Sequence, residues 1–144
     1  MYLLDTNVIS ELRKAAKADC RVIDWAGQAD AQCMYISAVS ILEIRLGILA
    51  VQRKDKAQSD ILNNWLTRQV IPAFAGRIIS VDTAVALRCA ELHVPNPRSD
   101  RDALIAATAL VHGLTVVTRN TKDFPDVSTV NPWLGVHYGV YTGI

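Results

Sequence analysis

Residues 102–124 read DALIAATALVHGLTVVTRNTKDF, and this stretch decides the fold that the sequence predicts. Its small and apolar residues recur at helical spacing as far as His112. Gly113 follows as the residue that most readily takes the left-handed conformation after a last helical turn. Residues 114–118 are apolar and β-branched, which is typical of a buried strand. A polar loop with Asp123 comes next, so the stretch forms half of an α/β unit.

This half-unit offers two carboxylates to one edge of a sheet. In open α/β sheets, ligands bind outside the carboxyl ends of the strands. Asp123 lies in the loop that leaves the strand. Asp102 lies in the first turn of the preceding helix, which Asp100 is placed to cap. We therefore expect Asp102 and Asp123 to face the same ligand site.

The remainder of the chain repeats the alternation of strands and helices. Its order predicts a three-layer α/β/α fold with a mostly parallel central sheet, and its 144 residues predict a single domain spanning 1–144. Further strands are expected at residues 2–5, 34–36, 77–81 and 127–130. Helices are expected over residues 8–12, 22–26, 38–51, 61–70 and 83–93, with Thr6, Asp19, Ser37 and Asp82 as caps and Pro72 near the end of the fourth.

Composition excludes several classes of protein. A hydrophobic fraction of 51%, a charged fraction of 20% and a net charge of +1 are typical of a globular protein, not of a strongly basic nucleic-acid-binding chain. No apolar run reaches the roughly 18 residues needed to span a bilayer, and MYLLDTN lacks the basic start of a signal peptide. Three cysteines without a C-x-x-C pair indicate reduced thiols. We expect a cytoplasmic protein with no membrane partner.

Four acids stand out for different local reasons. Asp5 ends the first strand, and Glu43 lies in a helix that is apolar on nearly every side, with no Lys or Arg three or four residues away. A buried carboxylate of this kind is paired across the fold, protonated or bound to a metal. Taken singly, each acid also fits the role of a cap, a turn former or an ion-pair member. The four are Asp5, Glu43, Asp102 and Asp123.

The predicted sheet brings these four carboxylates to one edge, where they repel one another unless a cation is present. A set of oxygen ligands without a His or Cys cluster favours Mg²⁺ or Mn²⁺ over zinc. Such ions commonly act on phosphate esters. Four cations crowd the last two acids, which suits a metal site that also holds a polyanion, although a solvated charged face fits the charge pattern equally well. They are Arg98, Arg101, Arg119 and Lys122.

The sequence resembles the PIN domain family, and within it the VapC and FitB type toxins of bacterial toxin–antitoxin pairs. The resemblance covers essentially the whole chain, and all of its blocks fall in order. The blocks are LLDTNVISEL at 3–12, SAVSILEIRLGI at 37–48, the stretch at 102–124 and NPW at 131–133.

The resemblance implies a function and places residues in it. Asp5, Glu43, Asp102 and Asp123 fall on the family's acidic metal-binding quartet. The polar residues beside the first and last acids are expected to support these ligands or to contact phosphate; they are Thr6, Asn7, Thr118 and Asn120. Arg119 and Lys122, with Arg98 and Arg101, are expected to attract RNA.

These expectations describe an Mg²⁺- or Mn²⁺-dependent endoribonuclease that leaves 5′-phosphate and 3′-hydroxyl ends. The resemblance further implies a homodimer and an antitoxin whose C-terminal segment covers the active-site groove, with DNA bound only through the antitoxin. The apolar helix pair within 38–70 suits a dimer interface, although burial in the core would give the same pattern. A PIN-like module that binds RNA or a partner without cutting remains the alternative.

Other enzyme classes fit less well. A haloacid-dehalogenase-like phosphatase needs a carboxylate two residues after its nucleophilic Asp, and here that position is Asn7. No G-x-G-x-x-G follows any strand, which argues against a dinucleotide-binding enzyme. The histidines lie at helix ends or in the tail, so serine–histidine catalysis has no support; they are His93, His112 and His137.

Overall fold

The computed structural model describes residues 1–135. Its strands form one five-stranded sheet in the order β3-β2-β1-β4-β5, and all neighbouring strands pair in parallel. The expected parallel sheet is confirmed, with the first strand at its centre. The strands are β1 (Tyr2–Leu4), β2 (Met34–Ser37), β3 (Ile78–Ile79), β4 (Thr115–Val117) and β5 (Thr129–Val130).

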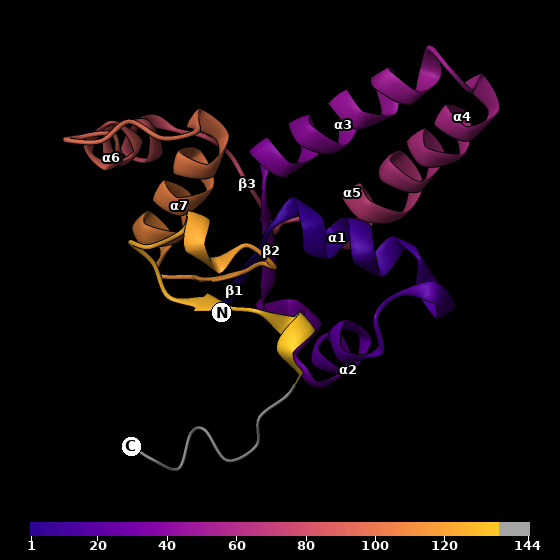
Figure 1. Cartoon of the computed structure of the whole chain (residues 1–144), viewed down its shortest axis with the longest axis horizontal. Coiled ribbons are helices and arrows are strands. Elements are labelled where there is room, and N and C mark those ends of the chain that lie inside the picture. Colours follow the sequence, from indigo (N-terminus) through magenta and orange to yellow (C-terminus); the bar gives the residue numbers. More distant parts are fainter. Residues whose placement is uncertain (136–144) are drawn as a thin grey trace.

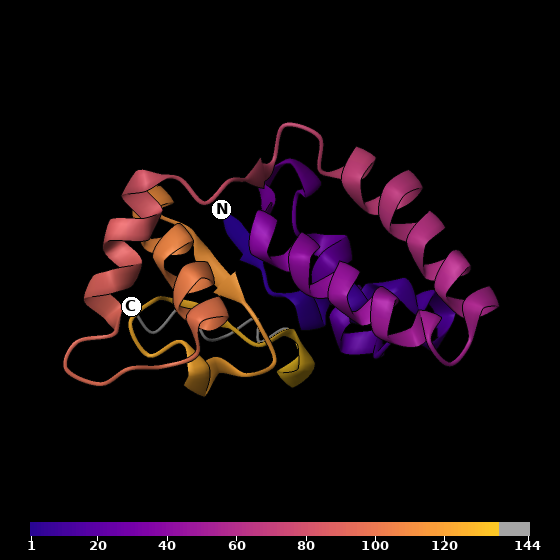
Figure 2. The same cartoon turned by 90° about the horizontal axis from the view of Figure 1, so that it is seen from above.

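Helices cover both faces of this sheet, as the three-layer prediction requires. Helices α6 and α7 lie on one side, and α1 to α5 lie on the other (Figures 1 and 2). A π-helical turn at Leu66–Val70 joins α4 to α5. The helices are α1 (Thr6–Arg13), α2 (Cys20–Gln28), α3 (Ala38–Gln52), α4 (Lys56–Trp65), α5 (Ile71–Ala73), α6 (Thr83–Leu92) and α7 (Asp100–His112).

The central strand β1 is buried on both faces. Successive side chains of a strand point to opposite faces, and Leu3 and Leu4 accordingly enter the two separate apolar clusters that hold the layers together. Leu3 packs with α6 and α7, and Leu4 packs with α1, α3 and the turn after α4. Because both leucines are almost fully buried, the backbone that leads into Asp5 is fixed from both sides.

Several expected helix boundaries are confirmed by their caps. The side chains of Asp19, Ser37 and Asp82 accept hydrogen bonds from the first-turn amides of α2, α3 and α6. Gly113 ends α7 in the left-handed conformation, with φ of 67°, which a side chain would disfavour. Short-range signals therefore locate most helix ends.

Two expected caps are wrong. Asp5, not Thr6, caps α1, because its Oδ1 accepts the amide of Thr6 at 2.8 Å. Ser99 occupies the cap position of α7 without a side-chain bond, and Asp100 is already the first residue of that helix. Asp100 lies instead 3.4 Å from His93, at the far end of the proline-rich loop.

The remaining expected boundaries concern Pro72 and the two outer strands of the sheet. Pro72 marks the approximate end of the helical segment as expected, because α5 ends one residue later, at Ala73. The preceding π-helical turn places Pro72 in the first turn of α5, where its missing amide is tolerated. The third strand is shorter than expected and begins after Arg77. The guanidinium of Arg77 donates to the carbonyls of Ala31 and Met34, both at 2.6 Å, and so ties β2 to this corner. The last strand is likewise only Thr129–Val130.

Helix α3 is covered by the chain on one face only. It buries Val39, Ile44 and Ile48, whereas Leu42, Leu46 and Leu49 remain 51%, 44% and 41% exposed. The apolar character of the whole helix is therefore not explained by the core of one chain.

The structure bears on two expectations from composition, which concern the cysteines and membrane-spanning segments. The three cysteines are free thiols, with Cys20 exposed, Cys33 half-buried and Cys89 buried. Within residues 1–135, no helix is both long and apolar enough to cross a bilayer.

Candidate active site

Asp5 lies at the carboxyl end of the central strand and is held through both of its carboxylate oxygens. Oδ1 accepts the amide of Thr6, and Oδ2 accepts the hydroxyl of Thr118 at 2.8 Å and the side-chain amide of Asn7 at 3.3 Å. The backbone amide of Asp5 donates to the carbonyl of Val117 on β4. Asp5 is only 8% exposed, so its orientation is set before any ligand binds.

Glu43 reaches the same region from α3. Its Oε1 accepts the hydroxyl of Thr6 at 2.8 Å, and its Oε2 lies 3.8 Å from Nη1 of Arg101 on α7. Of the alternatives for the Glu43 carboxylate, which were an ion pair across the fold, protonation or a bound metal, the structure shows the ion pair, with a cation on another helix. Arg45 turns away and donates to Asn63 at 2.7 Å.

The four predicted acids come close enough to perturb one another. Burial raises the pKa of Asp5, and the charges of Glu43 and Asp123 raise it further, against the lowering effect of the Thr118 and Thr6 hydrogen bonds. Burial also raises the pKa of Asp102, followed by the charges of Asp5, Asp123 and Glu43, while Arg101 lowers it. The carboxylates therefore form one concentration of negative charge.

Asp123 completes this group from the short 3-10 turn Thr121–Asp123 that follows β4. Its side chain is exposed, and it lines a polar hollow together with Asp102, Lys122 and Arg98. Thr6 and Glu43 line a second hollow, between α1 and α3. Asp102 and Asp123 thus line one depression, and Glu43 lines another.

The donor set fits a hard divalent cation in kind, because it consists of carboxylate oxygens without a nearby imidazole or thiolate. The raised pKa values of Asp5 and Asp102 are the response expected of a site that a cation would neutralise. The carboxylates lie farther apart than the ligands of an assembled metal site. Among residues 1–135, no three acidic, histidine or cysteine side chains lie close enough together to hold a metal ion.

The polar residues beside the acids differ in what they do. Thr6, Asn7 and Thr118 bond directly to Asp5 or Glu43. Asn120 contributes its backbone amide, which donates to Thr118 Oγ1 at 3.0 Å. The side chain of Asn120 makes no hydrogen bond to an acid within the described residues. The structure therefore shows Asn120 supporting Thr118 through its backbone.

The four cations also separate into two kinds. Arg98 pairs with Asp126, and Arg101 pairs with Glu43. Within the described part of the chain, neither Arg119 nor Lys122 lies within ion-pair distance of a carboxylate. Arg119 lies over the ring of Trp133, and Lys122 lines the hollow beside Asp102.

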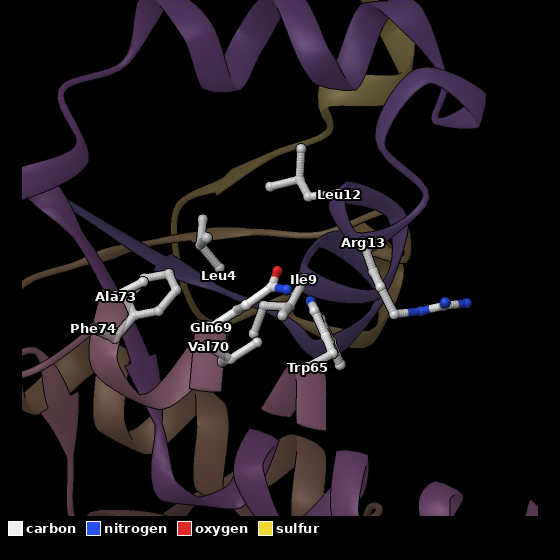
Figure 3. A pocket seen from close by; sticks show the side chains of 9 residues that line it. All are labelled: Leu4, Ile9, Leu12, Arg13, Trp65, Gln69, Val70, Ala73 and Phe74. Atoms are coloured by element: carbon white, nitrogen blue, oxygen red, sulfur yellow. The ribbon is translucent and has the colours of Figure 1, made fainter. Parts of the chain in front are cut away.

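A separate apolar pocket of about 190 Å³ opens between α1 and the end of the α4–α5 segment. It is lined by Leu4, Ile9, Val70 and Phe74, with Trp65 at one side (Figure 3). Among the described residues that line it, Arg13 alone is charged, and its guanidinium extends away from these apolar groups (Figure 3). No acid lines it, so it is not the site described above.

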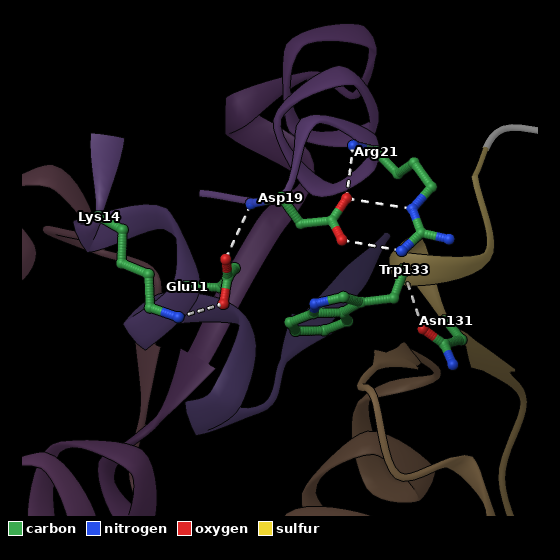
Figure 4. A network of polar contacts seen from close by, with 6 residues as sticks. All are labelled: Glu11, Lys14, Asp19, Arg21, Asn131 and Trp133. Atoms are coloured by element: carbon green, nitrogen blue, oxygen red, sulfur yellow. Dashed lines mark hydrogen bonds and ion pairs between the residues drawn. The ribbon is translucent and has the colours of Figure 1, made fainter. Parts of the chain in front are cut away.

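The structure also reveals two supporting residues that had no assigned role. Asn131 donates through Nδ2 to the carbonyl of Arg119 at 3.3 Å and accepts the amide of Trp133 at 2.9 Å. Arg119 donates its own amide to Oδ1 of Asn7 at 3.3 Å. Trp133 is buried beside Asp19 and Arg21 (Figure 4). The turn Asn131–Trp133 therefore clamps the loop that follows β4.

A signal for this clamp was present in the sequence, since NPW was one of the recognised blocks, but its contact with Arg119 spans twelve residues. The remaining aromatic residues of the tail, Tyr138 and Tyr141, lie outside the described residues, as does His137. His93 accepts the amide of Arg98 at 3.2 Å, which is a structural role, as expected.

Comparison with known proteins agrees with this architecture. Residues 2–130 match the PIN domain. The VapC ribonuclease Y4jK of Sinorhizobium fredii is 36% identical over 140 residues, which cover 92% of this chain and 98% of the relative.

Two solved structures have the same fold. The crystal structure of FitAcB from Neisseria gonorrhoeae matches with a TM-score of 0.82 and 38% identity, covering 92% of this chain and 99% of that one. A toxin–antitoxin complex from Klebsiella pneumoniae matches with a TM-score of 0.67 and 26% identity, covering 92% and 98%. From the sheet order, the acidic edge and these matches together, the chain belongs to the PIN domain family.

Proposed function

We propose that this chain is a divalent-metal-dependent endoribonuclease and the toxin of a toxin–antitoxin pair. The observation that carries the proposal is the electrostatic coupling of four carboxylates at the carboxyl edge of the sheet, with Asp5 fixed through both oxygens. The similarity to a protein named a VapC ribonuclease supports RNA as the substrate. One PIN-like domain spanning 1–144 would act in the cytoplasm, where such a substrate is found.

Asp5, Asp102 and Asp123 would hold Mg²⁺ or Mn²⁺, directly or through water. When bound, the ion would polarise the phosphoryl oxygen and lower the pKa of an attacking water. Glu43 would complete the ligand set or orient that water, and the hydroxyl of Thr6 fixes its Oε1 for this task. Hydrolysis of this kind would leave a 5′-phosphate and a 3′-hydroxyl.

The four cations near the acids would differ in how readily they bind the phosphates of the RNA backbone. Lys122 and Arg119 have no carboxylate partner within residues 1–135, so they can bind phosphate without breaking an ion pair. Arg98 and Arg101 would first have to leave Asp126 and Glu43. We therefore assign the main phosphate contacts to Lys122 and Arg119. Asn120, in the same loop, would offer its side-chain amide to phosphate.

The exposed leucines of α3 support a homodimer, since a second copy would cover Leu42, Leu46 and Leu49. Changing Leu46 to Asp is expected to shift the chain to a monomer in size-exclusion chromatography with light scattering. Leu87→Asp is the matched control, because Leu87 is 65% exposed on α6.

An antitoxin segment would cover the active-site groove, as the similarity to a toxin–antitoxin complex suggests. Any contact with DNA would then be made by the antitoxin. The apolar pocket beside Phe74 adjoins the groove through Arg13 and Trp65 and offers an anchor for such a segment.

The proposal is tested by incubating a mixed RNA pool that includes tRNAs with the antitoxin-free protein and Mg²⁺ or Mn²⁺. EDTA and Asp102→Asn serve as controls, and the ends are mapped. Metal-dependent cuts with 5′-phosphate ends, absent from the variant, are expected. Recovery of 2′,3′-cyclic phosphate ends would contradict the mechanism. No cleavage by the folded, metal-supplied protein would favour the alternative, a PIN-like module that binds RNA or a partner.

A further inference from the structure

Three depressions of the surface meet at one pair of side chains, Arg13 at the end of α1 and Trp65 at the end of α4. The guanidinium carbon of Arg13 lies 5.9 Å from the centre of the Trp65 ring. An arginine in this position is held by the electrons of the ring and by contact with its face. Arg13 is therefore placed with much less freedom than an ordinary surface arginine.

A second arginine shares one of these depressions. Arg68, in the π-helical turn after α4, lines the hollow that Arg13 and Trp65 also line. Asn64 and Gln69 add side-chain amides to its lining, and none of the described residues that line it carries a carboxylate. Two guanidinium groups on one hollow give its lining a positive charge, which a bound anion would neutralise.

Arg13 and Arg68 both belong to the cations that have no carboxylate partner within residues 1–135. Many cations in the described part of the chain are paired with acids; they include Lys14, Arg21, Lys56, Arg88, Arg98 and Arg101. Within residues 1–135, neither Arg13 nor Arg68 lies within ion-pair distance of an acid. Guanidinium groups bind phosphate through two parallel hydrogen bonds, so phosphate is the anion that this hollow fits.

The hollow is continuous with the acidic site. Thr6, Ser10 and Arg13 follow one another on a single face of α1 at helical spacing, and all three line the depression that also contains Glu43 and Trp65. Seven residues of helix separate Thr6 from Arg13, which is about 10 Å along the axis. An RNA strand lying along α1 from Glu43 would therefore bring one of its nearby backbone phosphates to Arg13.

We propose that Arg13 and Arg68 form a phosphate-binding subsite for the RNA backbone, a short distance along the strand from the bond that is cut. The inference rests on the proposed function, because the acidic site supplies the reason for an RNA strand to enter the groove. Trp65 positions Arg13 and does not itself contact the phosphate. The charge of the hollow favours this occupant over an apolar segment of protein.

The test measures RNA binding separately from cleavage. A fluorescein-labelled oligouridylate is titrated with the Asp102→Asn protein, and fluorescence anisotropy gives the dissociation constant at several salt concentrations. Each phosphate contact on a single strand contributes about 0.7 to the slope of log K against log salt. Arg13→Gln and Arg68→Gln are each expected to lower that slope by about 0.7.

Two further variants make the result specific. Arg53→Gln removes the same charge from the exposed end of α3 and is expected to leave the slope unchanged. Arg13→Lys keeps the charge and is expected to restore the slope. Arg68→Gln guards against misfolding, because Arg68 is exposed and makes no cation–π contact within residues 1–135 that its loss would break.

The outcomes separate the two proposals. If Arg13→Gln and Arg68→Gln match Arg53→Gln, the subsite is overturned while the nuclease stands on its own assay. If these variants bind RNA normally and lose only a protein partner, the hollow belongs to that partner and the inference is also overturned. If the slopes fall but the unaltered chain never cuts RNA, the subsite stands and the proposed nuclease does not.

Discussion

The guanidinium of Arg119 lies over the indole of Trp133, with 5.2 Å between the guanidinium carbon and the ring centre. Arg119 is exposed and Trp133 is buried, so the ring forms a fixed base for a cation at the edge of the active site. The same arginine donates its backbone amide to Asn7, which itself bonds to Asp5. The position of this cation and that of the central acid are thereby linked.

Replacing Trp133 with Leu is expected to raise the KM for RNA two- to fivefold with little change in kcat, because an exposed cation–π contact contributes about 0.5–1 kcal/mol. Trp133→Phe should keep most of the effect of the native ring. Arg119→Gln should raise KM as well, and the double variant should be no worse than Arg119→Gln alone. Steady-state kinetics on a defined RNA measures all four proteins.

Trp25→Leu is the control for this series, because the Trp25 ring contacts Tyr2 edge-on and holds no arginine. Additive effects of Arg119→Gln and Trp133→Leu would show that the ring does not act through the arginine.

Thr118→Val is expected to weaken metal binding about 10- to 100-fold, as loss of a hydrogen bond to a ligand commonly does. The hydroxyl of Thr118 donates to Asp5 Oδ2 at 2.8 Å and lowers the pKa of Asp5. Isothermal titration with Mn²⁺ measures the change. Thr108→Val is the control, since Thr108 is equally buried but donates only to the carbonyl of Leu104 within α7; an equal loss of affinity in this control would contradict the assigned role.

Asp102→Asn is expected to raise the melting temperature of the metal-free protein at neutral pH. Burial and the neighbouring acids raise the pKa of Asp102, so its ionised form destabilises the folded state relative to the unfolded state. Between the ordinary value of 3.8 and the raised value, the folded chain binds more protons. The unaltered protein therefore gains stability as the pH falls through that window, and the advantage of the variant shrinks.

Thermal melts in EDTA across this pH range, with both proteins, measure the difference. Adding Mg²⁺ at neutral pH should stabilise the unaltered protein more than the variant. A variant that melts lower than the unaltered protein in EDTA would show that Asp102 makes a net stabilising contact.

Asp19 provides a titration of the opposite sign. The Arg21 guanidinium and backbone amide lower the pKa of Asp19 to about 2, through the hydrogen bonds drawn in Figure 4. Its ionised form stabilises the folded state above the ordinary value of 3.8, and this contribution is lost as the pH falls through about 2. Carboxyl NMR should follow that midpoint, and Arg21→Gln should move it up towards 3.8; an unmoved midpoint would assign the shift to the backbone.

The sequence predicts those parts of the site that depend on short-range order. Asp5 and Asp123 follow strands, and strand order in a parallel sheet brings their positions to one edge. Asp102 follows from the helix that Gly113 ends. The exchange of caps between Thr6 and Asp5 shows the limit of such reasoning, because both side chains can accept a helix amide and only the packed structure selects one.

Contacts between distant segments were not predictable in the same way. Arg101 reaches Glu43 from another helix, which the spacing of residues around Glu43 does not reveal. Asn131 meets Arg119 because β4 pairs with β5, whose register places Val117 beside Val130. The π-helical turn before Pro72 was likewise not predictable, because its hydrogen bonding does not follow α-helical spacing.

Asp5 has two duties that a single substitution affects differently: it is a proposed metal ligand, and it begins α1. Asparagine is also a good helix cap, whereas alanine is a poor one. Asparagine at this position would thus remove the proposed metal ligand and keep the cap of α1. Alanine would remove both the ligand and the cap, and would therefore also destabilise the fold. Asp5→Asn is therefore the substitution expected to give an inactive but correctly folded protein, which is suited to production and to the capture of partners.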